Sequence, residues 1–147
     1  MARQALILAS HGEFAKAAKE TMEMIIGHEQ ENIGTVLVTE GKPYETALSE
    51  IKELYETLDT KDGCIVLTDI YGGTPANVAT YLAIEHMEDV RVFSGLNVPL
   101  LLEVVLDQTS SLTEMEDKIE TIHKDTLVNI SKKLKGMNEN GNQVDSY

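Results

Sequence analysis

The sequence contains one cysteine, Cys64, so no disulfide can form within the chain. Cys64 lies inside an apolar run, which favours a small buried side chain in a reducing compartment. Long apolar segments are missing as well. The first apolar run, at residues 5–9, is too short for a signal peptide, and no run approaches the length of a membrane span. We therefore expect a cytoplasmic protein with no direct membrane insertion.

Basic residues are scarce in this chain. Twelve lysines and arginines stand against 25 aspartates and glutamates, and the formal net charge is -13. Affinity for nucleic acid rests on basic side chains that neutralise phosphates, so we expect no nucleic-acid partner. A strong negative field also opposes a free nucleotide unless a basic site is built locally. The same field would steer a basic protein partner toward the surface.

Common cofactor and metal motifs are absent. The sequence has neither the phosphate-binding loop Gly-x-x-x-x-Gly-Lys nor the dinucleotide fingerprint Gly-x-Gly-x-x-Gly. No two of its four histidines have the spacing of metal ligands. We predict neither a metal nor a cofactor.

Short apolar runs alternate with segments of helical periodicity along the chain. This alternation indicates an α/β fold with a parallel sheet covered by helices on both faces. The length fits one domain, which we assign to residues 1–131, followed by a flexible polar tail at residues 132–147. We predict strands at residues 5–9, 33–39, 63–69 and 90–94, and helices at residues 13–27, 43–58, 75–87, 98–106 and 112–124.

Two of the predicted helices begin with capping signals. Thr74 is expected to cap the helix that has Pro75 in its first position. A Thr113–Glu116 capping box is expected at the start of the last helix. Residues 126–131 fit either a continuation of that helix or a short fifth strand.

Three loops with unusual residues, 10–12, 69–75 and 95–99, follow predicted strands. In open parallel sheets, ligands bind beyond the carboxyl ends of the strands, where the strand order reverses. If the first and third strands are neighbours, His11 and Asp69 project from the same edge. A carboxylate that accepts one imidazole N–H leaves the other ring nitrogen as a nucleophile. The alternatives are a histidine satisfied by a local hydrogen bond and an aspartate that caps a turn.

The segment Gly72-Gly73-Thr74-Pro75 is a candidate anion site. Two glycines allow a sharp turn and a close approach to a ligand, and the helix start behind them presents unpaired N–H groups. A plain strand-to-helix turn is the alternative. Without a basic cluster nearby, the segment suits a small, transient phosphoryl group better than ATP.

Three motifs follow the predicted strands in order: Ala9-Ser-His-Gly12, Leu67-Thr-Asp-Ile-Tyr-Gly-Gly-Thr-Pro-Ala-Asn77 and Ser94-Gly-Leu-Asn-Val-Pro-Leu-Leu101. Together they resemble the enzyme IIA components of the mannose-family phosphotransferase system, over about residues 3–131. The resemblance implies a phosphocarrier for sugar uptake. His11 would take a phosphoryl group on Nε2 from phospho-HPr and pass it to a separate IIB component, while Asp69 would hold Nδ1–H. The residues expected to bind the phosphoryl group are Ser10, Gly12, Gly72, Gly73 and Thr74.

The resemblance also implies a fold and an assembly. The fold would be a three-layer α/β/α structure around a four-stranded parallel sheet in the order 2-1-3-4. A short antiparallel fifth strand at residues 126–131 would be exchanged between the subunits of a homodimer. Ile70 stands where some members have a threonine, which removes a hydroxyl contact at that position.

Two other functions remain open on the sequence alone. The first is a phosphotransfer subunit that serves a dihydroxyacetone kinase, with the same chemistry and a different acceptor. The second is a ligand-binding or regulatory module on the same fold, with His11 inert.

Overall fold

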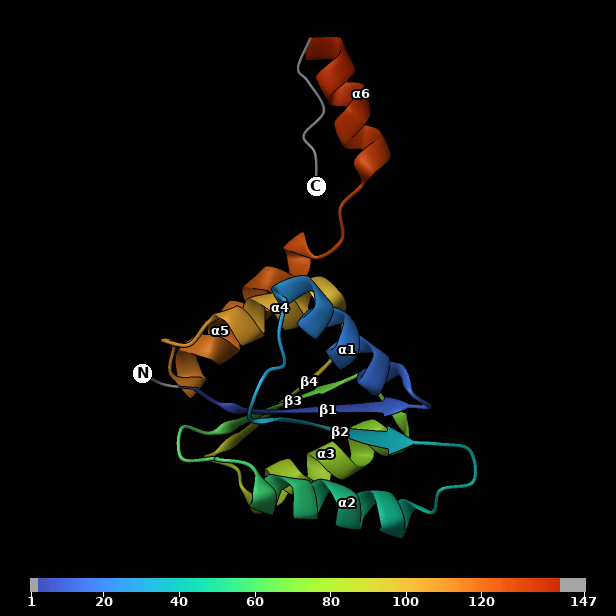
Figure 1. The fold of residues 1–147 in the computed structure, drawn as a ribbon, viewed down its shortest axis with the longest axis vertical. Helices are drawn as coiled ribbons and strands as arrows, with labels where there is room; N and C mark the ends of the chain where they lie inside the picture. The colour runs from blue at the N-terminus through green and yellow to red at the C-terminus, as the bar shows by residue number, and fades with distance from the viewer. Residues whose placement is uncertain (1–2, 141–147) are drawn as a thin grey trace.

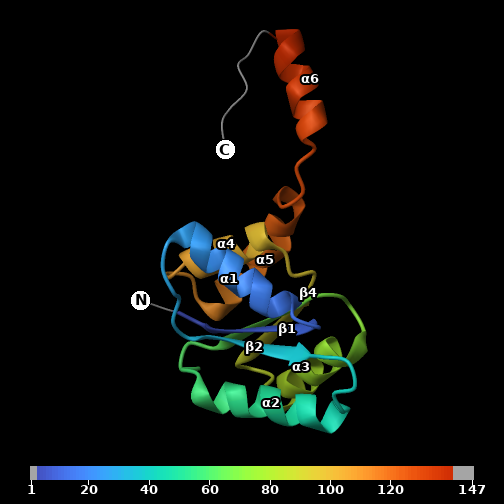
Figure 2. The ribbon, with the colours of Figure 1, turned by 45° about the vertical axis from the view of Figure 1, so that its right-hand side comes forward.

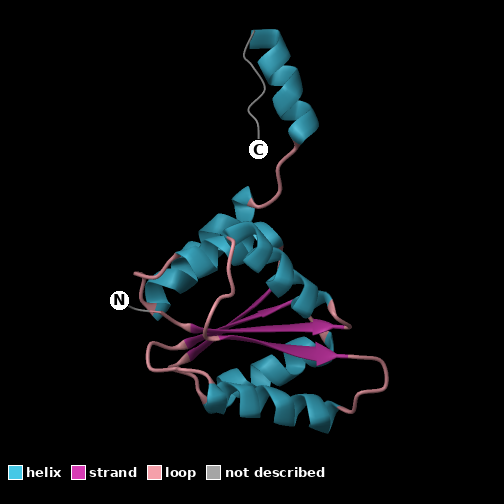
Figure 3. Ribbon diagram, viewed as in Figure 1, coloured by secondary structure: helices cyan, strands magenta, loops and turns pink. Residues whose placement is uncertain are grey.

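The computed structural model describes residues 3–140, which build three layers with the sheet in the middle (Figures 1 and 3). The strands pair in parallel in the order β2-β1-β3-β4, as predicted. The chain leaves β1 toward β2 on one side and returns to β3 on the other, so the order reverses between β1 and β3. The strands are β1 (Ala5–His11), β2 (Ile33–Val38), β3 (Cys64–Thr68) and β4 (Val90–Ser94).

Helices cover both faces of the sheet (Figures 1 and 2). One face carries α1 (Phe14–Ile26), α4 (Val98–Leu106) and α5 (Leu112–Ile122), and the other carries α2 (Tyr44–Thr57) and α3 (Gly73–Glu85). All nine predicted strands and helices are present, with bounds that differ by a few residues. None of the helices within residues 3–140 is long and apolar enough to cross a membrane.

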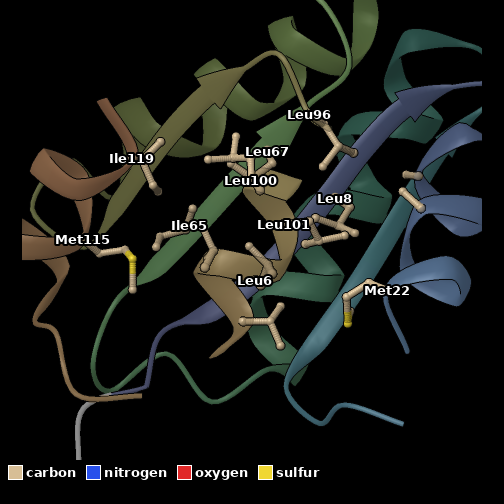
Figure 4. Packing of buried hydrophobic residues seen from close by; sticks show 14 residues of the cluster. Leu6, Leu8, Met22, Ile65, Leu67, Leu96, Leu100, Leu101, Met115 and Ile119 are labelled. Carbon is tan, nitrogen blue, oxygen red and sulfur yellow. The ribbon is translucent and has the colours of Figure 1, made fainter. Parts of the chain in front are cut away.

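The core consists of two clusters, one on each face of the sheet. Leu6 and Leu8 of β1 pack with Met22 of α1 in the first cluster (Figure 4). Alternate residues of the same strand, among them Ile7, pack under α2 and α3 in the second. Cys64 is fully buried in this second cluster, and burial raises the pKa of its thiol to about 12. The predicted burial of Cys64 is confirmed.

The start of α5 differs from the prediction. The Ser111 hydroxyl accepts the Glu114 N–H at 3.2 Å, and the Glu114 carboxylate accepts the Ser111 N–H at 3.1 Å. The predicted Thr113–Glu116 box is therefore wrong. A cap needs extended backbone just before the helix, which Ser111 has, whereas Thr113 already lies inside the first turn.

The fifth strand expected at residues 126–131 is not seen. After α5 come a 3₁₀ turn, η1 (His123–Asp125), an irregular stretch and α6 (Ile130–Asn140), which extends away from the sheet (Figure 1). An edge strand needs a hydrogen-bonded neighbour, and one chain alone does not bring this segment to β4. α6 spans the predicted domain boundary at residue 131. Residues 141–147 of the predicted tail lie outside the described residues, and the flexibility of the tail stays a prediction.

Candidate active site

His11 is the last residue of β1 and lies on the face that α2 and α3 cover. Because side chains alternate along a strand, the neighbouring Ser10 faces α1 instead. The Ser10 hydroxyl is fully buried and accepts the N–H of Ala15, in the first turn of α1, at 2.7 Å. Ser10 thus holds the start of the helix, while the His11 side chain reaches the sheet edge with 48% of its surface exposed.

Asp69 follows β3 directly, and strand pairing brings it beside His11. Ala9 pairs with Thr68, so the residues after them meet at the edge. Oδ2 of Asp69 accepts the backbone N–H of His11 at 2.9 Å and lies 2.9 Å from Nδ1 of the ring. An ionised carboxylate only accepts hydrogen bonds, so Nδ1 carries the proton and Nε2 keeps a free electron pair. The predicted contact between the two side chains is present.

The hydrogen bonds around Asp69 keep its carboxylate ionised. Burial by itself would raise the pKa of this carboxyl. The backbone N–H and ring of His11, together with the Ile70 N–H at 2.9 Å, outweigh burial and lower the pKa below its usual value. Asp69 is therefore a permanent anion at neutral pH and can stabilise positive charge on the imidazole.

Two glycines lie at the start of α3, and the second of them is next to the histidine ring. Gly72 and Gly73 have φ angles of 92° and 83°, in the region that favours glycine. A Cβ on Gly73 would lie 2.9 Å from both Nε2 and Cε1 of His11, so only a residue without a side chain fits there. The helix start is thereby brought against the ring edge that carries the free electron pair.

The cap of α3 differs from the prediction. Gly72 is the N-cap, and Thr74 is the second helical residue instead of the cap. Pro75 moves to the third helical position, where its missing N–H costs nothing because no intrahelical acceptor exists in the first turn. The positive φ of the two glycines allows the helix to begin earlier than capping rules suggest.

The remaining predicted site residues differ in their contacts. The Gly12 N–H donates to the Val38 carbonyl at 2.9 Å, which ties the turn after β1 to the end of β2. Thr74 lies partly buried at the start of α3, and Ser10 is turned away into α1. Gly73, predicted to bind the phosphoryl group, lies close to the imidazole.

Thr68 and Ser94, which were not predicted as site residues, connect the ends of β3 and β4. Their hydroxyls lie 2.7 Å apart, and the Thr68 carbonyl accepts the N–H groups of Gly95 and Leu96, each at 2.9 Å. These bonds fix the loop after β4 to the end of β3. Both residues are polar and end apolar strands that pair in register, which is the signal that would have revealed them.

The fold and the site define a parallel α/β protein with an aspartate-oriented histidine at the switch point of its sheet. The chain matches the EIIA-man family model, described as PTS system fructose IIA component, over residues 5–123 and belongs to this family.

Individual relatives agree with this assignment. The chain is 33% identical over 113 residues to the PTS system mannose-specific EIIAB component of Escherichia coli, covering 76% of this chain and 34% of that protein. It is 36% identical over 107 residues to the PTS system fructose-specific EIIA component of Bacillus subtilis, covering 68% and 67%. The chain thus spans about a third of the length of the Escherichia coli relative it matches.

A solved structure is also similar. It is the PTS IIA protein associated with the fucose utilization operon of Streptococcus pneumoniae, with a TM-score of 0.79 and 30% identity. The match covers 91% of this chain and 99% of that one.

Proposed function

We propose that the protein is a cytoplasmic phosphocarrier, the IIA component of a phosphoenolpyruvate-dependent sugar phosphotransferase system. His11 accepts a phosphoryl group from phospho-HPr and passes it to a histidine of a separate IIB component. The observation that carries this proposal is the 2.9 Å contact between Asp69 Oδ2 and His11 Nδ1, which leaves Nε2 as an open nucleophile at the start of α3. Membership of the EIIA-man family supports it.

The transfer step uses the lone pair of Nε2. This pair attacks the phosphorus of the donor phosphohistidine, so the Nε2–P bond forms as the donor N–P bond breaks. The donor imidazole keeps the electrons of the broken bond. The His11 ring gains positive charge, which the Asp69 carboxylate stabilises through Nδ1–H. Transfer to the acceptor repeats the step with the roles exchanged.

The proposed phosphoryl site lies between the turn at Gly12, after β1, and the turn at Gly72 and Gly73, at the start of α3. The first N–H groups of a helix have no intrahelical partner and favour an anion, and in α3 they belong to Gly73 and Thr74. The Thr74 hydroxyl and the backbone at Gly12 and Gly72 would complete the contacts with the phosphoryl oxygens. Ser10 would act through α1, whose start it holds.

We also propose a homodimer in which residues 126–131 of each copy add an antiparallel fifth strand to β4 of the other. Within residues 3–140, β4 pairs with β3 alone, which leaves its outer edge free. The residues 126–131 include Thr126, Val128 and Ile130, which are β-branched and favour strands.

The test of the proposed function is phosphorylation in vitro. With phosphoenolpyruvate, enzyme I and HPr, the wild-type protein should acquire an acid-labile phosphoryl group. His11→Ala should abolish this label, whereas His28→Ala should keep it, because His28 is exposed near the end of α1 and away from the carboxyl edge of the sheet. An unlabelled wild-type protein would overturn the proposal.

A second incubation identifies the acceptor. The labelled protein is mixed either with a IIB component or with the nucleotide-binding subunit of a dihydroxyacetone kinase. We expect IIB to remove the label and the kinase subunit to leave it. Removal by the kinase subunit alone would assign the protein to that kinase instead.

A further inference from the structure

Three large, exposed apolar side chains follow His11 or Asp69 closely in the chain, in or next to the loops that carry the site. They are Phe14, the first residue of α1, at 47% exposure, and Ile70 and Tyr71, after Asp69, at 57% and 95%. The Ile70 N–H donates to Oδ1 of Asp69 at 2.9 Å, so this loop is fixed to the His11–Asp69 pair. We call Phe14, Ile70 and Tyr71 the apolar rim.

The fold does not account for the apolar rim. Tyr71 is 95% exposed, so its side chain packs against almost nothing in the described part of the chain. A polar residue would serve the turn before Gly72 equally well. Clustered apolar side chains on a surface mark interaction sites, and tyrosine is among the residues that supply most of the binding energy in protein interfaces. The rim therefore has the properties of a docking surface.

The chemistry of His11 determines what covers the rim. A phosphorus atom must come within about 3–3.5 Å of the attacking nitrogen. A protein that carries this phosphorus on its own histidine must therefore bring its surface onto the loops around His11. Residues 3–123 hold 22 acidic and eight basic side chains, so a surface that complements this chain is basic.

We propose that the apolar rim is the docking surface for a phosphohistidine-bearing protein, with Tyr71 as its main anchor. The partner surface is apolar next to its phosphohistidine and basic farther out. This inference rests on the proposed function, and it assigns Tyr71 to partner binding and not to the chemistry at Nε2.

Two phosphoryl donors separate docking from chemistry. Phospho-HPr must dock, whereas phosphoramidate is a small donor that reaches Nε2 without a protein interface. Tyr71→Ala should raise the KM for phospho-HPr at least tenfold, with kcat little changed. Its rate of labelling by phosphoramidate should equal that of the wild type.

Met87→Ala is the matched control. Met87 is also large, apolar and 75% exposed, but it follows α3 at the opposite edge of the sheet. We expect this variant to react like the wild type with both donors.

Three results would overturn the inference. The first is a normal KM of Tyr71→Ala for phospho-HPr, and the second is an equal loss with both donors, which would assign Tyr71 to the reaction itself. The third is an equal loss in Met87→Ala, which would show a general effect of apolar surface. A wild-type protein that neither donor labels would instead overturn the proposed function, and the docking inference with it.

Discussion

One carboxylate oxygen, Oδ2 of Asp69, accepts the backbone N–H of His11 and also contacts Nδ1 of its ring. The orientation of the imidazole is therefore tied to the backbone of β1 through Asp69. This explains how a ring with about half its surface in solvent keeps one nitrogen directed at the start of α3.

Replacing Asp69 by asparagine should slow phosphoryl transfer while leaving the fold intact. The amide keeps an oxygen acceptor but loses the negative charge that stabilises the imidazole, and loss of such an orienting partner typically costs about 10- to 100-fold in activity. We expect the rate of labelling by phospho-HPr to fall by about this factor, with an unchanged circular dichroism spectrum. Asp117→Asn, an exposed position on α5, is the control. Wild-type kinetics in Asp69→Asn would show that the carboxylate has no role in the reaction.

The contact between His11 and Asp69 could be predicted because it follows from strand order alone. Two other features could not. The contact of Gly73 with the ring depends on the spacing between α3 and β1, which no local pattern reports. The direction of the Ser10 side chain follows from the alternation of side chains along β1. It was not predicted, because the motif suggested that Ser10 and His11 bind the same phosphoryl group.

At the scale of elements, the sequence predicts which segments are strands and helices better than where they begin. Apolar runs and helical periodicity extend over many residues, so β1–β4 and α1–α5 were identified, whereas α6 lies mostly where a flexible tail was predicted. Helix starts depend on single residues. At α5, the cap is Ser111, two residues before the predicted Thr113. At α3, two glycines with positive φ shift the start from the position that Thr74 suggests.

The loop between α4 and α5 is held by one aspartate. The Asp107 carboxylate accepts Lys118 Nζ at 2.8 Å, the Ser110 hydroxyl at 2.7 Å and the N–H groups of Thr109 and Ser110, each at 3.0 Å. Lys118 in first place, with Ser110 and Thr109, lowers the pKa of this carboxyl far below its usual range. Asp107 therefore joins the two helices through its charged form.

Asp107→Asn should destabilise the protein at neutral pH by about 1–3 kcal/mol, the effect of losing hydrogen bonds to a charged group. Because the folded-state pKa is lowered, the stabilisation is complete above the unfolded value of about 3.9 and is lost as the pH falls toward the folded-state value. Urea unfolding at pH 7 and at pH 3 should thus give a smaller difference from wild type at the lower pH. Asp117→Asn should match wild type at both, and a gap that does not depend on pH would contradict this account.

At the scale of the whole molecule, the free edge of β4 and the segment that leads to α6 are the two surfaces that the proposed dimer would join. If residues 126–131 pair with β4 of a second copy, sedimentation should give twice the mass of one chain. Val128→Pro should yield a monomer, because proline removes an N–H that a strand needs. Val128→Thr keeps the N–H and the β-branch and should remain a dimer. A wild-type monomer, or a dimeric Val128→Pro variant, would refute strand exchange.

Ser10 and His11 are adjacent in the chain but serve opposite layers, one fastening α1 and the other facing α3. Deleting a single residue within β1 would therefore exchange their directions and turn the imidazole into the apolar layer under α1. The number of residues in β1 therefore determines which layer the imidazole faces.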